Sequence, residues 1–434
     1  MSTGRKWNFG AGPAMIPRSV LEKVQREFLD YENTGVSLIE LSHRSQAYED
    51  LNNEAQKQLA KLLNIPSNYK IIFMQGGGHT QFAAVVYNLL AWRHHQNKTA
   101  TTKPQSDNWR DIPVDYIVTG SWSAKAAEEA KRLGANVRVI CDAKKVLGGY
   151  TGIPEESTWK TSDPNGEFRS ADRAAGQTPA YLYYCDNETV NGVEFPNVPS
   201  MHDPAVPLVC DMSSNILSRP VDVSKFGIIY AGAQKNIGPA GVTLVIVRED
   251  LLQTAELADG LFPVPLMLDY KTTVKNNSLY NTPPMFGIYV SKLVFDWLLD
   301  ADAQRVQDGA QSQGGNLVGV EAAAARNERK AAKLYKALEE SRFCRLVVTD
   351  KAARSKMNVP FRITKTKNDP SAVANKAEDE AMETAFVAEA ESKGLLQLAG
   401  HRSVGGIRAS IYNAMPEEGI DVLIAFIKEF EQKY

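Results

Sequence analysis

Apolar residues in the first two-thirds of the chain follow two alternating patterns. From Arg18 to Tyr31 and from Glu49 to Leu63 they recur every three or four positions, which predicts two amphipathic helices. A third helix is predicted from Thr80 to Trp92. Between these helical segments and after them lie continuous apolar runs of strand length, which are the strand candidates: Lys70–Met74, Val114–Thr119, Val137–Cys141, Ala180–Cys185, Val206–Cys210, Phe226–Ala231 and Val242–Val247.

Most of these runs are apolar throughout rather than alternating, which is typical of strands in a sheet that is covered on both faces. Because predicted strands and helices are interleaved, the pattern indicates an α/β fold with a mostly parallel sheet. Ligands on such a sheet gather at the carboxyl ends of the strands. The residues that follow each strand are therefore the first candidates for function.

The last third of the chain has a different pattern, which predicts a smaller α+β domain. A chain of 434 residues also exceeds what one ordinary hydrophobic core holds. We expect an N-terminal segment (1–16) that packs with the small domain, a large domain (17–290) and a small C-terminal domain (291–434). The chain enters the small domain through a predicted helix at Pro284–Leu299. Further helices are predicted at Glu321–Glu340 and Pro416–Tyr434, and strands at Phe343–Val348, Asn358–Ile363 and Ile407–Ile411. Three polar insertions are expected to be surface loops without chemistry: His94–Pro113, Ser157–Gln177 and Lys365–Glu380.

Composition and charge exclude several classes of partner. The net charge of −2 creates no overall field that would draw the protein onto nucleic acid or an anionic membrane. No run of about 18 apolar residues is present that could span a bilayer. The first nine residues lack the features of a signal peptide, and the four scattered cysteines are expected to be buried, reduced thiols. We therefore expect a cytoplasmic protein, and one without a metal site, since the six histidines form no cluster with ligand spacing.

The segment from Tyr230 to Gly241 contains a candidate reactive lysine. A buried strand ends there in small residues, and Lys235 follows at the point where the sheet opens. Lysine is rarely buried without a partner, and no acidic residue lies between Ser224 and Arg248 to pair with it locally. Desolvation would lower the pKa of Lys235 and leave an amine able to form an imine. A lysine on an exposed turn is the alternative that this segment alone leaves open.

An aspartate at the end of the preceding strand favours the reactive lysine. Asp211 directly follows the predicted strand Val206–Cys210. Pyridoxal phosphate needs such a pair, because a lysine carries its aldehyde carbon and a carboxylate keeps its pyridine nitrogen protonated, so that the ring accepts carbanion electrons. A lone aspartate at a strand end is usually a helix cap or a turn residue. An aspartate and a lysine on successive strand ends instead indicate a pyridoxal-phosphate site.

Two further features support a phosphate-bearing, planar ligand. Gly76, Gly77 and Gly78 lie between a predicted strand and a predicted helix, where free backbone N–H groups bind phosphate well. Their spacing fits neither GxGxxG nor GxxxxGK[ST], which disfavours a dinucleotide site or a P-loop. Trp122 follows the strand that ends at Thr119 and could stack on a planar ring, although a tryptophan of the core is an equally good interpretation.

Eight stretches carry motifs specific to one family: Asn8–Ala14, Ser42–Arg44, Gly76–Gly78, Asn187–Thr189, Ala231–Gly241, Asn281–Pro284, Gly400–Arg402 and Gly405–Tyr412. Through them the chain resembles, along nearly its whole length, the phosphoserine aminotransferases, which are class V, fold-type I pyridoxal-phosphate enzymes. The resemblance implies a large domain with a mostly parallel seven-stranded sheet and a smaller α+β C-terminal domain.

The resemblance also implies a role for each residue of the cofactor site. Lys235 is expected to hold pyridoxal 5′-phosphate as a Schiff base and Asp211 to pair with the pyridine nitrogen; these are the two expected catalytic residues. Trp122 is expected to stack on the ring, with Thr189 beside it. The cofactor phosphate is expected to bind residues from both subunits of a homodimer with shared active sites: Gly78, His79 and Gln234 of one chain with Asn281 and Thr282 of the partner subunit.

Cationic residues are implied for the substrate. Arg408 is expected to bind the α-carboxylate, which suits the bidentate contact that arginine makes. The phosphate of phosphoserine, or the side-chain carboxylate of glutamate, is expected to meet two His-Arg pairs, His401 and Arg402 of the same chain and His43 and Arg44 of the partner subunit. In a chain of nearly zero net charge, such local cations are what a dianionic substrate needs.

The implied reaction is the reversible transamination of 3-phosphohydroxypyruvate with L-glutamate, which gives O-phospho-L-serine and 2-oxoglutarate in serine biosynthesis. Another class V enzyme is the alternative, either an alanine–glyoxylate aminotransferase or a cysteine desulfurase. A desulfurase needs a reactive cysteine on a mobile loop, whereas the cysteines here lie in or at the ends of predicted strands. A non-catalytic cofactor-binding protein is a further alternative, and the presence of Lys235, Asp211 and Arg408 argues against it.

Two positions depart from many bacterial members of that family. His79 stands where they often have arginine, and Ala11 stands where they often have serine. The expected phosphate contact at position 79 is mainly through the backbone N–H, so little should be lost there. Ala11 removes a possible hydroxyl contact.

Overall fold

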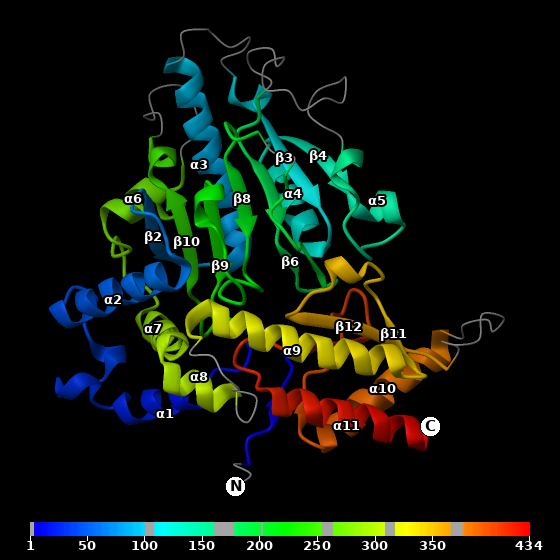
Figure 1. Ribbon diagram of the computed structural model, residues 1–434. Coiled ribbons are helices and arrows are strands. Elements are labelled where there is room, and N and C mark those ends of the chain that lie inside the picture. The colour runs from blue at the N-terminus through cyan, green and yellow to red at the C-terminus, as the bar shows by residue number, and fades with distance from the viewer. Residues whose placement is uncertain are drawn as a thin grey trace.

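The computed structural model describes residues 4–99, 108–159, 178–200, 203–253, 264–308, 317–365 and 376–434. Its largest element is a seven-stranded sheet, built from β2 (Tyr69–Met74), β3 (Pro113–Val118), β4 (Asn136–Asp142), β5 (Leu182–Cys185), β8 (Leu208–Asp211), β9 (Ile228–Gly232) and β10 (Thr243–Arg248) (Figure 1). The strand order is β2-β10-β9-β8-β5-β3-β4. β10 is antiparallel to both of its neighbours, and the pairings from β9 through to β4 are parallel. The predicted α/β fold with a mostly parallel seven-stranded sheet is confirmed.

Helices cover both faces of this sheet, as the apolar strands predict. Successive residues of a strand point to opposite faces, so Ile229 belongs to one hydrophobic core and Tyr230 to the other. The Ile229 face packs on α1 (Arg18–Glu27), α2 (Gln46–Leu63) and α7 (Met285–Leu299), and the Tyr230 face packs on α3 (Gly77–Thr99) and α4 (Ser121–Arg132). Short helices complete this part of the chain: α5 (Ala143–Leu147), α6 (Tyr270–Lys275) and α8 (Ala301–Asp308).

A second, smaller body lies beside the lower edge of the large sheet in Figure 1. It contains the antiparallel sheet β11-β12-β14, from β11 (Cys344–Leu346), β12 (Asn358–Ile363) and β14 (Ile407–Ser410), with α9 (Gly319–Glu340), α10 (Lys376–Ser392) and α11 (Glu417–Lys433). The N-terminal strand β1 (Trp7–Asn8) pairs with β13 (Leu395–Leu396), and Phe9 packs in the core of this body. The domain boundaries at 16/17 and 290/291 stay predictions; α7 crosses the second of them.

The element boundaries differ from the prediction mainly in the polar segments. His94–Thr99, predicted as part of a surface loop, continues α3, and His94 is buried. Lys376–Glu380, predicted as the end of another loop, forms the first turn of α10. A helix is not excluded by polar residues when one of its faces packs on the body of the protein. The rest of the three insertions lies largely outside the described residues, at 100–107, 160–177 and 366–375.

Among the described residues, no helix is both long enough and apolar enough to cross a membrane.

Candidate active site

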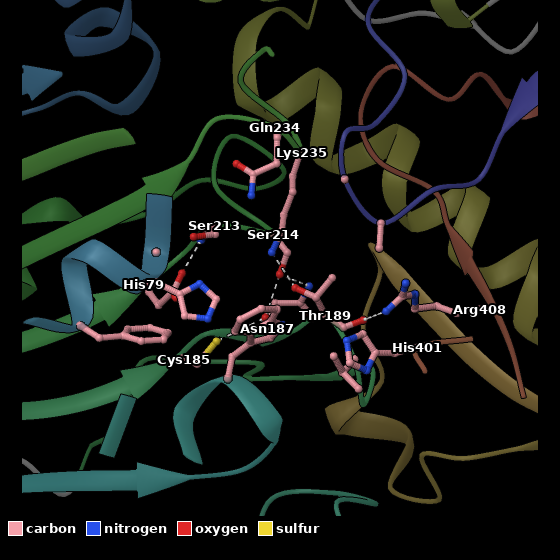
Figure 2. A pocket seen from close by; sticks show the side chains of 17 residues that line it. His79, Cys185, Asn187, Thr189, Ser213, Ser214, Gln234, Lys235, His401 and Arg408 are labelled. Carbon is pink, nitrogen blue, oxygen red and sulfur yellow. Dashed lines mark hydrogen bonds between the residues drawn. The ribbon is translucent and has the colours of Figure 1, made fainter. Parts of the chain in front are cut away.

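A cavity of about 260 Å³ lies at the carboxyl ends of β5, β8 and β9. Cys185 and Asp211, the last residues of β5 and β8, line it, and Lys235 enters it from the turn after β9. His401 and Arg408 of the smaller body close it from the other side (Figure 2). The parallel strands thus bring residues far apart in sequence to one edge of the sheet, where ligands of such sheets bind.

Lys235 is held by a tight turn and by one hydrogen bond. Ala233 accepts bonds from the backbone N–H groups of both Lys235 and Gly238, each at 2.7 Å. The Lys235 ammonium donates to Thr189 Oγ1 at 2.7 Å, and Figure 2 shows its chain reaching from the turn toward Thr189. Burial lowers the pKa of Lys235 and the charge of Arg408 lowers it further, while Asp211 acts in the opposite direction. A lowered pKa favours the neutral amine that nucleophilic chemistry requires.

Asp211 is buried on the wall of the same cavity. Its Oδ1 accepts a bond from the N–H of Ser213 at 2.8 Å, which fixes the carboxylate at the strand end. Its other oxygen, Oδ2, would lie 3.7 Å from a Cβ at Gly78. The absence of a side chain at Gly78 leaves the space beside this carboxylate free for a ligand.

Two helices begin at this cavity, and their N-termini differ. At α4, Asn191 Oδ1 accepts from the N–H of Ser121, and the Glu188 carboxylate accepts from those of Trp122 and Ser123. At α3, the N–H of Gly77 donates to Thr243 Oγ1, and no acidic side chain lies in the first turn. The first N–H groups of a helix bind anions. A ligand phosphate therefore fits the start of α3 and is excluded from that of α4.

Trp122 and His79 lie on the same wall. Their rings meet edge to face, with centroids 5.4 Å apart, and Lys235 Nζ is 5.8 Å from the centroid of the Trp122 ring. Trp122 Nε1 is buried and has no hydrogen-bond partner among the described residues. An aromatic face beside a buried amine is suited to stack on a planar ring. Of the two interpretations left open for Trp122, the position on the cavity wall favours stacking.

Arg408 and His401 form the opposite side, to which Arg408 brings a positive charge. Arg408 Nη1 donates to the carbonyl of Thr189 at 3.4 Å, and its Nε is buried without a partner within the described residues. Burial lowers the pKa of His401, and the charge of Arg408 lowers it further. The guanidinium of Arg408 therefore retains hydrogen-bonding capacity for a carboxylate.

Five of the predicted site residues do not line this cavity: His43, Arg44, Asn281, Thr282 and Arg402. His43 and Thr282 lie together, with Nδ1 of the histidine 3.4 Å from Oγ1 of the threonine. Arg44 is exposed, Asn281 lines a separate cavity with Tyr280 and Pro284, and Arg402 lines one beside α10. One chain therefore contributes the other nine residues and leaves these five away from the centre.

The prediction missed several residues of the cavity wall: Ala11, Gly12, Phe82, Cys185, Asn187, Val190, Ser213 and Ser214. Ala11, which has no hydroxyl to offer, still lies on the wall, and its carbonyl accepts a bond from Tyr412 Oη at 2.9 Å. Asn187 and Ser213 each lie within two positions of a predicted residue, so their sequence neighbourhood was a usable signal. The prediction also missed Glu188, which lies behind the wall and accepts bonds from the start of α4. No sequence signal could have found it, because its partners Trp122 and Ser123 lie 66 and 65 positions earlier in the chain.

Comparison with known proteins identifies the family. The family model described as "Aminotransferase class-V" matches residues 6–142 and 158–423. The phosphoserine aminotransferase of Laribacter hongkongensis is 43% identical over 99% of this chain and 99% of its own length. That of Drosophila melanogaster is 44% identical over 97% of this chain and 98% of its own length.

Solved structures agree with this result. A phosphoserine aminotransferase from Bacillus circulans subsp. alkalophilus superposes with a TM-score of 0.79 at 40% identity, over 99% of both chains. A pyridoxal-phosphate-bound phosphoserine aminotransferase from Trichomonas vaginalis does so with a TM-score of 0.77 at 35% identity, over 98% of this chain and 100% of its own. The resemblance found in the sequence motifs is confirmed, and the chain belongs to the class-V aminotransferase family.

Proposed function

We propose that this protein is a pyridoxal-phosphate-dependent phosphoserine aminotransferase. It transfers the amino group of L-glutamate to 3-phosphohydroxypyruvate, reversibly, and forms O-phospho-L-serine and 2-oxoglutarate in serine biosynthesis. The observation that carries the proposal is the placement of Lys235, a half-buried lysine with a lowered pKa, in the same cavity as Asp211. Full-length relatives of 43–44% identity that bear this name support the choice of substrate.

The residues of the cavity suit pyridoxal phosphate. The space beside Asp211 at Gly78, the open start of α3, and the ring of Trp122 on the cavity wall are features that a planar, phosphorylated pyridine would use. Lys235 would hold the cofactor and Asp211 would pair with its ring nitrogen, with Trp122 and Thr189 beside the ring. The phosphate would be held by Gly78, His79 and Gln234, and by Asn281 and Thr282 of the partner subunit.

When bound, the cofactor supplies an electron sink for the α-carbon of the substrate. Lys235 would move the proton: its Nζ, whose pKa burial lowers, would take the proton from the substrate α-carbon and deliver it to the aldehyde-derived carbon of the cofactor. Thr189 Oγ1, which accepts from Nζ, orients the amine. The buried carboxylate of Asp211 holds a proton on the pyridine nitrogen.

At the substrate end, Arg408 binds the α-carboxylate through the guanidinium edge that has no partner among the described residues. His401 and Arg402, with His43 and Arg44 of the partner subunit, bind the phosphate or the second carboxylate. This arrangement requires a homodimer, since His43 and Arg44 do not line the cavity of their own chain. We propose that this homodimer acts in the cytoplasm.

The alternative class V activities have less support. An alanine–glyoxylate aminotransferase from Nostoc shares the fold, with a TM-score of 0.65, at only 17% identity. A cysteine desulfurase needs an accessible thiolate. All four cysteines are buried, and burial raises the pKa of Cys141, Cys185 and Cys210. None of them has the character of a reactive thiol.

Absorbance spectroscopy of the purified holoenzyme tests the proposal. Glutamate should convert the cofactor to its amino form, and 3-phosphohydroxypyruvate should restore the original spectrum. Glyoxylate and pyruvate, which lack a phosphate, serve as matched acceptors and should restore it far more slowly. Equal rates with glyoxylate would contradict the proposed substrate, and sulfide release from cysteine would favour a desulfurase.

A further inference from the structure

Helix α4 is capped from outside its own sequence. Its N-cap position is Gly120, which has no side chain to serve the first N–H groups. Glu188, the last residue of β6 (Asn187–Glu188), and Asn191 of the turn that follows supply the acceptors instead. Glu188 Oε2 accepts from the N–H of Trp122 at 2.8 Å, and Oε1 accepts from the N–H of Ser123 at 2.9 Å and from Ser123 Oγ at 2.5 Å. Asn191 completes the cap, because its Oδ1 accepts from Ser121.

The absence of a side chain at Gly120 makes this cap possible. A Cβ at Gly120 would lie 2.3 Å from Cγ and Cδ of Glu188 and 2.5 Å from its Oε2. The glycine backbone is extended here, so its conformation does not require glycine. The requirement is for space, which the Glu188 side chain fills. The two positions are therefore complementary in shape.

The arrangement is costlier than an ordinary helix cap. Glu188 has no exposed surface, and no ion pair joins it to a cation in the described part of the chain. Burial raises its pKa to about 7, against the hydrogen bonds from Ser123 and Trp122, and the nearby charge of Asp211 raises it further. A serine or aspartate at position 120 would cap the helix without burying a carboxylate so deeply. This cost suggests a task beyond stabilising α4.

The contacts of Glu188 and its chain neighbour reach two parts of the reaction centre. Its carboxylate holds the backbone N–H of Trp122, the aromatic residue on the cavity wall. The next residue in the chain, Thr189, accepts the hydrogen bond of Lys235 Nζ. The ring of Trp122 and the amine of Lys235 lie 5.8 Å apart but belong to α4 and to the turn after β9. Glu188 joins the segment that orients the amine to the helix that carries the ring.

We propose that Glu188 is a positioning residue, which fixes the ring of Trp122 relative to Lys235 and Thr189, the groups that a planar cofactor would contact together. The inference rests on the proposed function, because it assumes that a planar cofactor lies in this cavity. Glu188 itself does not contact the substrate or the cofactor in this proposal. Its effect is transmitted through the start of α4 and through Thr189.

The test uses the holoenzyme and the variants Glu188→Ala and Glu188→Gln. Glu194→Gln is the matched control, because Glu194 is a buried glutamate of the neighbouring strand β7 (Val193–Glu194) that bonds to Asn215 and to the backbone of Lys356. Glu188→Ala should lower kcat at least about tenfold while the KM for glutamate changes less than about threefold. It should also weaken the circular dichroism of the cofactor band, and Glu188→Gln, which keeps one acceptor oxygen, should recover most of both signals.

A double-mutant cycle with Trp122→Phe separates positioning from general stability. If Glu188 acts through Trp122, Glu188→Ala should have a much smaller effect on kcat in the Trp122→Phe background than in the original protein. Unchanged cofactor dichroism and kcat in Glu188→Ala would overturn the inference, as would strict additivity in the cycle. If Glu188→Ala does not fold, Ser123→Ala, which removes one bond to the carboxylate, gives the same readouts. If the unsubstituted protein does not carry out the half-reaction with glutamate, the proposed function is refuted, and not the inference about Glu188.

Discussion

Lys235, Asp211 and Thr189 come from three neighbouring segments at one sheet edge and are held by short hydrogen bonds. The cations predicted to bind the substrate are spread differently. Arg408 and His401 reach the cavity from the smaller body, Arg402 lines another cavity, and the remaining His-Arg pair lies elsewhere on the chain. Proton transfer requires precise placement, which a rigid sheet provides. Anion binding tolerates longer, separate side chains, so the substrate end can be completed by other segments and by assembly.

The largest expected effect is at the cofactor end. Lys235→Ala should abolish transamination, because the variant lacks the amine that moves the α-proton. Borohydride treatment of the holoenzyme should label the peptide that contains Lys235. Lys125→Ala is the matched control, since Lys125 Nζ lies 4.6 Å from the Trp122 ring, closer than Lys235. Labelling at Lys125 would show that the reactive amine was assigned to the wrong lysine.

Asp211→Ala should keep the cofactor but lose the electron sink. Its kcat should fall by an amount that corresponds to an activation barrier higher by on the order of 4–6 kcal/mol. Single-turnover kinetics of the glutamate half-reaction would measure it. Asp115→Asn is the control: Asp115 is a buried aspartate of β3, which β5 separates from β8 in the same sheet, and it pairs with Arg138. It should reduce stability and leave kcat nearly unchanged. A near-normal kcat in Asp211→Ala would place the carboxylate elsewhere.

At the substrate end, Arg44→Ala should raise the KM for phosphorylated substrate strongly. The loss of binding free energy should be roughly 2–5 kcal/mol if the Arg44 charge is desolvated when the dimer forms. The cofactor spectrum should be retained, because Lys235 and Asp211 are intact.

Mixing Lys235→Ala chains with Arg44→Ala chains tests whether the two ends belong to different subunits. In the mixed dimer, one site combines an intact Lys235 with an intact Arg44 of the partner subunit. Activity should recover toward half that of a normal dimer. If subunit exchange is verified and no activity returns, Arg44 serves its own chain.

The smallest effect is expected at Arg362, which tethers the loop that carries His401 and Arg402. Its Nη1 donates to the carbonyl of Val404 at 3.0 Å, and its Nε pairs with Glu383 at 2.6 Å. Arg362→Met should raise the KM for phosphorylated substrate about fivefold, a loss of about 1 kcal/mol, with little change in kcat.

Arg345→Met is the control for Arg362, because Arg345 lies directly opposite it in the β11–β12 pairing. No bond from Arg345 to the loop is present among the described residues. Equal effects of the two substitutions would point to the summed charge of this strand face rather than to the tether.

The prediction from sequence was accurate where local signals and chemistry coincided. The strand cores were located to within a few residues, because continuous apolar runs of strand length have few other structures open to them in an α/β chain. Lys235 and Asp211 were recognisable because each follows such a run. The extension of α3 through the polar residues to Thr99 was missed, since its amphipathic signal is weak and the packing that stabilises it comes from distant segments.

By itself the sequence determined the fold class and the family, and it supplied the residues proposed to carry the chemistry, because periodicity and family motifs are local properties of the chain. The tertiary structure decided what depends on distant contacts. It selected α3 rather than α4 as the free helix N-terminus, since Glu188 and Asn191 close α4 from another part of the chain. It also separated the nine predicted residues at the cavity from the five outside it. No periodicity encodes such contacts, because they are created only when the sheet brings the strand ends together.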